Sequence, residues 1–196
     1  MSEADRLLDT VYNSLGIANL NKAQKYQRIN DIVDELGKLN INQKINGKTT
    51  GTISERLCEL ALESALGKDS YETMGQKWKW IGDFSIAGKP FNVIVSVKSF
   101  KAKERLISSG SGHILSPTIG WGLFNDPKEW GDVRTKSYVF RAFTAIYMPQ
   151  PLYNKLSVSS KAVTNLNGKL FLRTIDDFAI DLSKASIANR IDITKI

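Results

Sequence analysis

The sequence has 196 residues, of which 42% are hydrophobic and 24% charged, and this ordinary balance excludes general disorder. Its single cysteine, Cys58, excludes an intramolecular disulfide framework and a cysteine-rich zinc site, and no apolar run approaches the ~20 residues of a membrane span. Basic side chains exceed acidic ones by 27 to 20, which favours a polyanionic partner such as nucleic acid, although the same excess could simply keep a basic protein soluble.

The N-terminal sequence MSEADRLLDTVY mixes acidic and basic residues ahead of a short amphipathic stretch. This is not the pattern of a secretory signal. Together with the single cysteine, it predicts a location in the reducing cytoplasm, without membrane contact. The length of the chain predicts one domain over residues 1–196.

Helices are predicted in the first third of the chain. Residues 5–15 and 18–37 repeat apolar side chains at three- and four-residue intervals, which predicts two amphipathic helices. Residues 38–51 are polar and contain two glycines, so we expect a linker or an exposed arm. A helix over residues 53–66 follows, introduced by a capping box from Thr52 to Glu55.

Two strands joined by a short turn are predicted in the middle of the chain. The segments KWKWIGDFSI and FNVIVSVK flank the turn sequence AGKP, and Ser96 and Lys98 share one face of the second strand. If residues 87–90 form the loop, Asp83 lies opposite Ile94, diagonal to Ser96, on the face that carries Lys98. The pairing therefore predicts an acid and an amine that converge on one side of a hairpin.

The rest of the chain alternates between irregular and apolar segments. KAKERLISS could form a short helix, and the glycine-rich residues 108–132 predict a long loop that binds something or is disordered. Residues 137–148 predict a buried central strand. A strand, KLFLR, and a helix, TIDDFAIDLSK, follow. This order predicts an α/β (α+β) fold with a mixed sheet flanked by helices.

Asp83 and Lys98 have the chemistry that phosphodiester hydrolysis needs. An aspartate oxygen could hold Mg²⁺, which would polarise a phosphoryl oxygen and generate a hydroxide nucleophile. Lys98, with its pKa lowered by burial and by the metal, could orient or deprotonate the attacking water. The alternative is an ordinary acid–amine pair on a solvated hairpin.

The helix predicted over residues 53–66 carries an acidic stripe of Glu55, Glu59 and Glu63. Like charges at this spacing repel by a few tenths of a kcal/mol per pair, so we expect positive groups to face the stripe. Either Glu55 or Glu59 could point at a metal beside Asp83. The alternative is a solvent-facing stripe in which Glu55 completes the capping box.

An acidic helix, then Gly82-Asp83 on one strand and Ser96-Val97-Lys98 on the next, resembles the PD-(D/E)XK nuclease superfamily, which includes type II restriction endonucleases. The resemblance covers about residues 50–148, the expected catalytic core. It implies a restriction-endonuclease-like mixed central β-sheet flanked by α-helices. It also implies that Asp83 binds the metal, that the Val97 carbonyl is a further ligand, and that Lys98 assists the nucleophile.

One position departs from the superfamily pattern, because Ser96 replaces the usual second carboxylate. Some restriction enzymes of the superfamily also have serine there and recover a carboxylate from the helix that follows, for which Glu104 is the candidate here. If neither Glu104 nor Glu55 reaches the metal, the chain would be a DNA-binding protein with a degenerate site. The candidate catalytic residues are Asp83, Ser96, Lys98, Glu55 and Glu104, and the candidate metal ligands are Asp83, Val97 and Glu55.

Contacts to DNA are expected just after the candidate lysine. Basic side chains there could reach phosphates: Lys101, Lys103 and Arg105. The glycine- and serine-rich loop could meet phosphates or base edges through Ser109, Ser111 and His113. The alternatives are a solvated charge run and a flexible surface loop. We expect the tryptophans to be core or interface anchors: Trp78, Trp80, Trp121 and Trp130.

The resemblance implies a Mg²⁺-dependent type II restriction endonuclease that acts on double-stranded DNA as a homodimer. Residues 1–40 are then candidates for dimerisation or DNA binding. A cognate DNA methyltransferase is expected as a genetic rather than a physical partner. The alternatives are a structure-selective repair or junction-resolving nuclease of the same fold, a non-catalytic DNA-binding module, and a basic protein-interaction domain.

Overall fold

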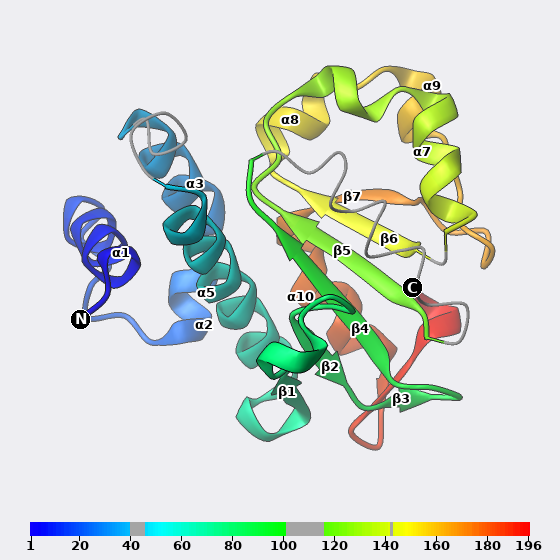
Figure 1. The fold of residues 1–196 in the computed structure, drawn as a ribbon, viewed down its shortest axis with the longest axis horizontal. Helices are drawn as coiled ribbons and strands as arrows, with labels where there is room; N and C mark the ends of the chain where they lie inside the picture. The colour runs from blue at the N-terminus through cyan, green and yellow to red at the C-terminus, as the bar shows by residue number, and fades with distance from the viewer. Residues whose placement is uncertain (40–45, 101–115, 142) are drawn as a thin grey trace.

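A computed structural model describes residues 1–39, 46–100, 116–141 and 143–196 (Figure 1). Within these residues a mixed sheet has the strand order β1-β2-β4-β5-β6-β7. The first two strands are antiparallel to their neighbours and the other four run parallel. The strands are β1 (Tyr71–Thr73), β2 (Phe84–Ile86), β4 (Val93–Lys98), β5 (Thr118–Gly122), β6 (Phe143–Met148) and β7 (Leu172–Thr174). A second, smaller sheet joins β3 (Gly88–Lys89), β9 (Arg190–Asp192) and β8 (Ser186–Ile187).

Helices cover both sides of the central sheet, which confirms the predicted fold class. Figure 1 shows α1, α2 and α3 gathered around α5 on one side and α7, α8 and α9 at the opposite side. Both α5 and α10 contribute to the apolar cluster that packs on β4, whereas α7 packs with β6 in a second cluster. The bounds are α1 (Glu3–Ser14), α2 (Lys22–Tyr26), α3 (Ile29–Lys38), α5 (Gly47–Leu66), α7 (Asp132–Val139), α8 (Gln150–Asn154), α9 (Val158–Lys161) and α10 (Ile175–Ala185). Among the residues that the structure describes, no helix has the length and hydropathy needed to cross a membrane.

The predicted start of the long helix is wrong. Asn46 caps α5, because its Oδ1 accepts a hydrogen bond from the Thr49 N–H at 2.9 Å, and the helix runs from Gly47. Residues 47–51 therefore belong to a helix rather than to an exposed arm. The capping box expected at Thr52 is absent, since this residue lies inside the helix and its hydroxyl donates to the Lys48 carbonyl.

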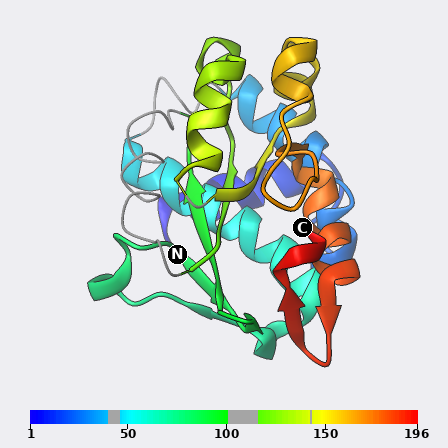
Figure 2. The same ribbon diagram turned by 90° about the vertical axis from the view of Figure 1, so that its right-hand side faces the viewer.

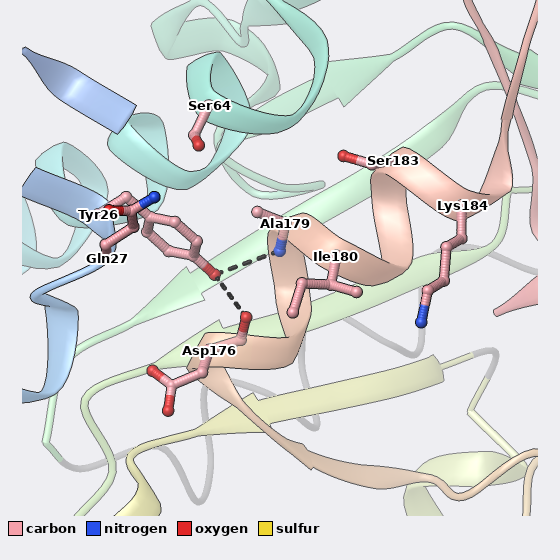
Figure 3. A pocket seen from close by; sticks show the side chains of 8 residues that line it. All are labelled: Tyr26, Gln27, Ser64, Asp176, Ala179, Ile180, Ser183 and Lys184. Atoms are coloured by element: carbon pink, nitrogen blue, oxygen red, sulfur yellow. Dashed lines mark hydrogen bonds between the residues drawn. The ribbon is translucent and has the colours of Figure 1, made fainter. Parts of the chain in front are cut away.

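The helix predicted over residues 18–37 is divided into α2 and α3, which meet at Gln27 and Arg28. Tyr26, the last residue of α2, connects this break to the far end of the chain. Its hydroxyl donates to carbonyl oxygens at the start of α10 and accepts from the Ala179 N–H at 3.2 Å (Figure 3). The short helix α2 thus ends where its tyrosine anchors it against α10.

The hairpin register differs by two residues from the predicted one. Ile86 pairs with Val93 instead of Phe91. In this register Asp83 lies opposite Ser96 instead of Ile94. The connection is longer than a four-residue turn because Gly88 and its neighbour pair with β9 as strand β3. A shift of two residues keeps every side chain on its face, so the expected convergence survives.

The first half of the predicted strand KWKWIGDFSI is not a strand. Residues 76–78 form a 3₁₀-helix and the ladder begins only at Phe84. Trp78 and Trp80 are 49% and 61% exposed, so these two residues are not core anchors. Trp121 and Trp130 are buried as expected. Figure 2 shows the connection between β1 and β2 extending away from the sheet.

The glycine-rich segment predicted as a loop over residues 108–132 contains β5, a fully buried strand between β4 and β6. Glycine signals a loop in sequence, yet here it permits close packing: a Cβ on Gly122 would lie 2.7 Å from the Lys98 carbonyl oxygen. The apolar strand predicted over residues 137–148 is also shorter than expected. It begins at Phe143, because residues 137–139 belong to α7.

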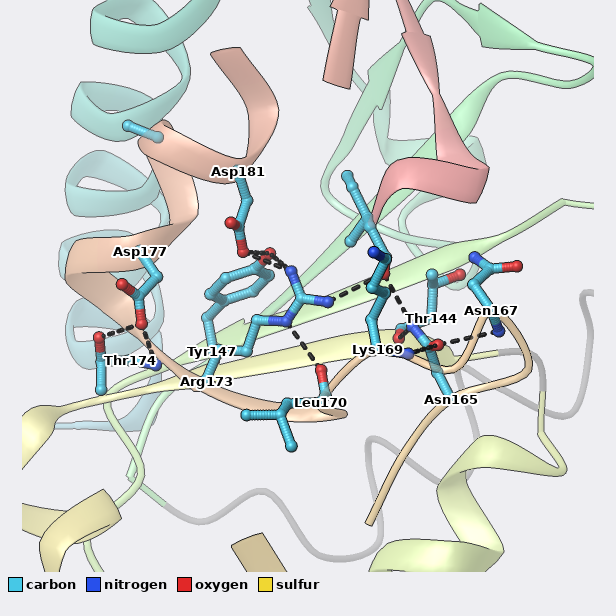
Figure 4. Close-up of polar contacts among 12 residues, drawn as sticks. Thr144, Tyr147, Asn165, Asn167, Lys169, Leu170, Arg173, Thr174, Asp177 and Asp181 are labelled. Atoms are coloured by element: carbon cyan, nitrogen blue, oxygen red, sulfur yellow. Dashed lines mark hydrogen bonds and ion pairs between the residues drawn. The ribbon is translucent and has the colours of Figure 1, made fainter. Parts of the chain in front are cut away.

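A polar cluster fastens the C-terminal end of the chain to β6 and β7 (Figure 4). Arg173 forms an ion pair with Asp181, which also accepts a hydrogen bond from the Tyr147 hydroxyl at 2.8 Å. The same guanidinium donates to the Ile196 carbonyl at 2.9 Å, and Asn165 donates to that carbonyl from the other side. Burial raises the pKa of Tyr147, so the phenol stays a neutral donor.

We expect Arg173→Met to destabilise the protein by about 2–4 kcal/mol, because it removes the cation that pairs with the half-buried Asp181 carboxylate and one of the two donors to the Ile196 carbonyl. The free energy of unfolding in urea measures the change. Arg28→Met is the matched control, since its ion pair with Asp31 is about half exposed and should contribute less than about 1 kcal/mol. Equal effects of the two substitutions would contradict a structural role for the cluster.

Candidate active site

A cleft of about 900 Å³ opens where the first half of α5, the β1–β2 connection and the end of β4 meet. The helix contributes Gly47, Lys48, Gly51, Thr52 and Glu55. The connection contributes Gln76, Lys79, Trp80 and Asp83. The end of β4 contributes Val97 and Lys98, and Ser99 follows the strand directly. The cleft thus gathers charged residues from three segments that are distant in sequence.

Asp83 is held against β4 by both its backbone and its side chain. Its N–H donates to the Val95 carbonyl at 2.8 Å, and its Oδ2 accepts from the Val97 N–H at 2.7 Å. The preceding glycine allows this approach, because a Cβ on Gly82 would lie 2.3 Å from Ile94 Cγ2. Only 8% of Asp83 is exposed, so the carboxylate has a defined position at the bottom of the cleft.

Burial raises the pKa of Asp83 above its ordinary value of 3.8. The positive charge of Lys98, the hydrogen bond from Val97 and the charge of Lys79 act in the opposite direction, whereas the charge of Glu55 adds to the rise. The carboxylate therefore sits in an environment that stabilises its charge incompletely. Such an environment favours the binding of a cation.

Lys98 and Ser96 lie side by side on β4, as the strand period predicts. The Lys98 Nζ donates to the Ser96 Oγ at 2.7 Å, and Ser96 is fully buried. Lys98 and Asp83 line the same cleft and interact electrostatically. The structure therefore brings together the acid and the amine that the sequence places on neighbouring strands.

Of the two glutamates considered for the metal, Glu55 lies in the cleft and Glu59 does not line it. Both Glu55 oxygens accept hydrogen bonds from the Lys79 Nζ, at 2.8 and 2.9 Å. Glu59 instead pairs with Arg56 at 3.2 Å and accepts from the Tyr71 hydroxyl. With Glu63 paired to a lysine of α2, the whole acidic stripe meets positive groups, which confirms that expectation.

Lys79 is a charged residue of the cleft that the sequence did not indicate as part of the site. Its Nζ lies between two carboxylates, bonded to Glu55 and 3.9 Å from the Asp83 Oδ1. The available signal was its position four residues before Asp83. The alternating pattern of the segment predicts a strand and hides this spacing, whereas the segment forms a 3₁₀-helix and a turn.

The oxygen atoms of the cleft fit a hard divalent cation. Along a strand, carbonyl groups two residues apart point to the same edge. The Val97 carbonyl therefore faces the same edge of β4 as the Val95 carbonyl, which accepts from the Asp83 N–H. In the described ranges no three His, Cys, Asp or Glu side chains cluster as a metal site. Mg²⁺ does not require such a cage, because it binds through one or two carboxylates, waters and substrate phosphates. The cleft offers two carboxylates, Asp83 and Glu55, beside Val97, and their role as metal ligands stays a prediction.

Several predicted site residues fall in residues 101–115, outside the described part of the chain. They are the candidate carboxylate Glu104 and the candidate DNA contacts Lys101, Lys103, Arg105, Ser109, Ser111 and His113. Their roles stay predictions.

Comparison with known proteins shows the fold. No protein-family model and no curated protein matches the chain. Among solved structures, a complex of the restriction endonuclease PspGI with substrate DNA has a TM-score of 0.61 at 11% identity and covers 92% of both chains. A metal-depleted Ecl18kI in complex with uncleaved, modified DNA has a TM-score of 0.48 at 12% identity, over 92% of this chain and 62% of that one. The chain therefore has a restriction-endonuclease-like fold.

We expect Asp83→Asn to stabilise the protein at neutral pH by about 0.5–2 kcal/mol when a chelator is present. The raised pKa means that the folded state disfavours the ionised carboxylate relative to the unfolded chain. That cost applies above the folded-state pKa and disappears as the pH falls below 3.8, so the advantage of asparagine should disappear in acid. Thermal unfolding across this pH range measures it. Asp69→Asn, which changes an exposed aspartate, should bring no stabilisation, and a less stable Asp83→Asn at pH 7 would contradict the argument.

We expect Lys79→Met to tighten the binding of Mg²⁺ roughly threefold to tenfold, because the lysine amine competes for Glu55 and Asp83. Isothermal titration calorimetry without DNA gives the affinity directly. Lys77→Met, two residues away and also removing one positive charge, is the matched control. Weaker binding by Lys79→Met would mean that the lysine orders the carboxylates for the metal instead of competing with it.

Proposed function

We propose that this protein is a Mg²⁺-dependent endonuclease of double-stranded DNA, and within that class a type II restriction endonuclease. The observation that carries the proposal is the meeting of Asp83 and Lys98, from two segments of the mixed sheet, in one cleft with a further carboxylate. A restriction-endonuclease-like fold around this cleft supports the same class of reaction.

The residues of the cleft divide the chemistry between them. Asp83, Glu55 and the Val97 carbonyl would hold the metal ion, which when bound supplies Lewis acidity at the phosphoryl oxygen and a water of lowered pKa. Lys98 would orient the attacking water and offset negative charge that develops at the phosphate. Ser96 keeps the Lys98 amine in place through its hydroxyl, so it acts as a positioning residue.

Charge and the structural neighbour support DNA as the substrate. The chain carries a net charge of +7, and Lys48 and Lys98 line the cleft. The PspGI structure is a complex with substrate DNA. A small subunit with one such site cuts both strands most simply as a homodimer, which sedimentation analysis would test. A gene for a cognate DNA methyltransferase beside this one would support a restriction system.

We expect the purified protein to convert plasmid DNA into discrete fragments in Mg²⁺ and not in a chelator. Asp83→Asn and Lys98→Met should each lower the cleavage rate at least about 10²-fold, because one removes a metal ligand and the other the group that assists the nucleophile. Lys195→Met, an exposed lysine beside the C-terminal strand β9, should cut at the normal rate.

Unchanged cleavage by Asp83→Asn would remove this residue from the mechanism. Salt-sensitive DNA binding without cleavage would identify a non-catalytic DNA-binding module instead. Faster cleavage of branched than of linear duplex DNA would identify a structure-selective nuclease.

A further inference from the structure

The four tryptophans of the chain occupy two very different environments. Trp121 and Trp130 are buried, each at most 1% exposed, whereas Trp78 and Trp80 leave about half or more of their surface in solvent. Exposing a large aromatic side chain forfeits the stabilisation that its burial would bring. Neither exposed indole is therefore explained by the apolar core.

The two exposed indoles stand on a projection of the chain, where Trp80 lines the cleft and Trp78 precedes it by two residues. Figure 2 shows the β1–β2 connection extending away from the sheet. The Met74 N–H donates to the Asp83 carbonyl at 2.9 Å, which closes the base of the projection. The Trp78 carbonyl accepts from the Ile81 N–H at 2.8 Å, which shapes its tip. Because Asp83 is part of that base, the position of the indoles is coupled to the position of the carboxylate.

Basic side chains lie near both indoles, and in the cleft they outnumber the two carboxylates, Glu55 and Asp83. The Lys77 amine lies 5.8 Å from the centre of the Trp78 ring, and Trp80 lines the cleft together with Lys79 and Lys48. Protein–protein interfaces are depleted in lysine, so this mixture does not favour a second protein as the occupant. Aromatic rings among basic side chains are instead the combination that binds single-stranded nucleic acid, where bases stack and phosphates pair with cations.

We infer that Trp78 and Trp80 form a stacking platform for unpaired nucleobases at the mouth of the cleft. The inference rests on the proposed function for its nucleic-acid substrate and goes beyond it in naming the form of DNA. An indole can stack only on a base whose face is uncovered, and in an intact duplex both faces are covered by neighbouring bases. The platform therefore favours DNA with unpaired bases close to the phosphate that faces Asp83 and Lys98.

Binding of three fluorescein-labelled DNAs in a chelator tests this: an intact duplex, the same duplex with a short internal loop, and the single strand. We expect W78A/W80A to bind the looped and single-stranded DNAs at least about tenfold more weakly than the unsubstituted chain, and the intact duplex within about twofold. W78F/W80F, which keeps aromatic rings, should recover most of the loss. F140A, at the end of α7, removes another exposed aromatic ring and should bind all three DNAs normally.

Tryptophan fluorescence gives a second readout that does not depend on activity. Acrylamide should quench the emission of the two exposed indoles, and looped DNA should protect them, whereas the buried pair should be insensitive to both. Equal losses on all three DNAs, or no loss, would overturn the platform. A change from dimer to monomer in W78A/W80A would also overturn it, because the indoles would then serve a protein interface.

The plasmid assay in Mg²⁺ separates this inference from the proposed function. If the unsubstituted chain cuts DNA but W78A/W80A shows no selective loss of binding, the nuclease stands and the platform fails. If selective binding to looped DNA depends on the indoles while no DNA is cut, the platform stands and the nuclease fails.

Discussion

The attachment of Asp83 to β4 is the constraint on which the candidate site depends. One hydrogen bond from its backbone and one to its carboxylate tie it to alternate residues of the strand that carries Lys98. Strand β2 begins only at the next residue, Phe84, which pairs with Val95. The end of β4 after Val95 therefore has no β2 residue beside it, and Val97 and Lys98 line the cleft there. The same residue therefore ends the sheet pairing and begins the site, and a change in either affects the other.

The cleft concentrates charge at some cost to stability. A buried carboxylate whose pKa is raised by desolvation is less stable than the same group in water, and the nearby Glu55 adds to that cost. Lys79 offsets part of it by pairing with both carboxylates. Unfavourable proximity of like charges is typical of sites that bind a cation or a phosphate. The ion pairs elsewhere on α5 instead neutralise the partly buried Glu59 and Glu63.

The β1–β2 connection carries three features of the candidate site within residues 78–83. It supplies Asp83 at its base, Lys79 between the carboxylates, and two indoles at its exposed end. A strand interpretation of KWKWIGDFSI hides this, because alternation places the tryptophans on one face as core residues. The segment instead forms a 3₁₀-helix, which repeats about every three residues, and a turn. Neither has the two-residue alternation that the sequence pattern suggests.

Local patterns in the sequence determined α1, α10 and the greater part of α5, the strand with Ser96 and Lys98, and the convergence of Asp83 on that strand. The convergence survives because a two-residue change of register keeps every side chain on its face. Only the tertiary structure decided that Glu55 enters the cleft and Glu59 does not, and that Lys79 lies between the acids. It also decided that the glycine-rich residues 118–122 form a buried strand. These outcomes depend on how α5 and the neighbouring strands pack, and packing between distant segments leaves no periodic signal in any one of them.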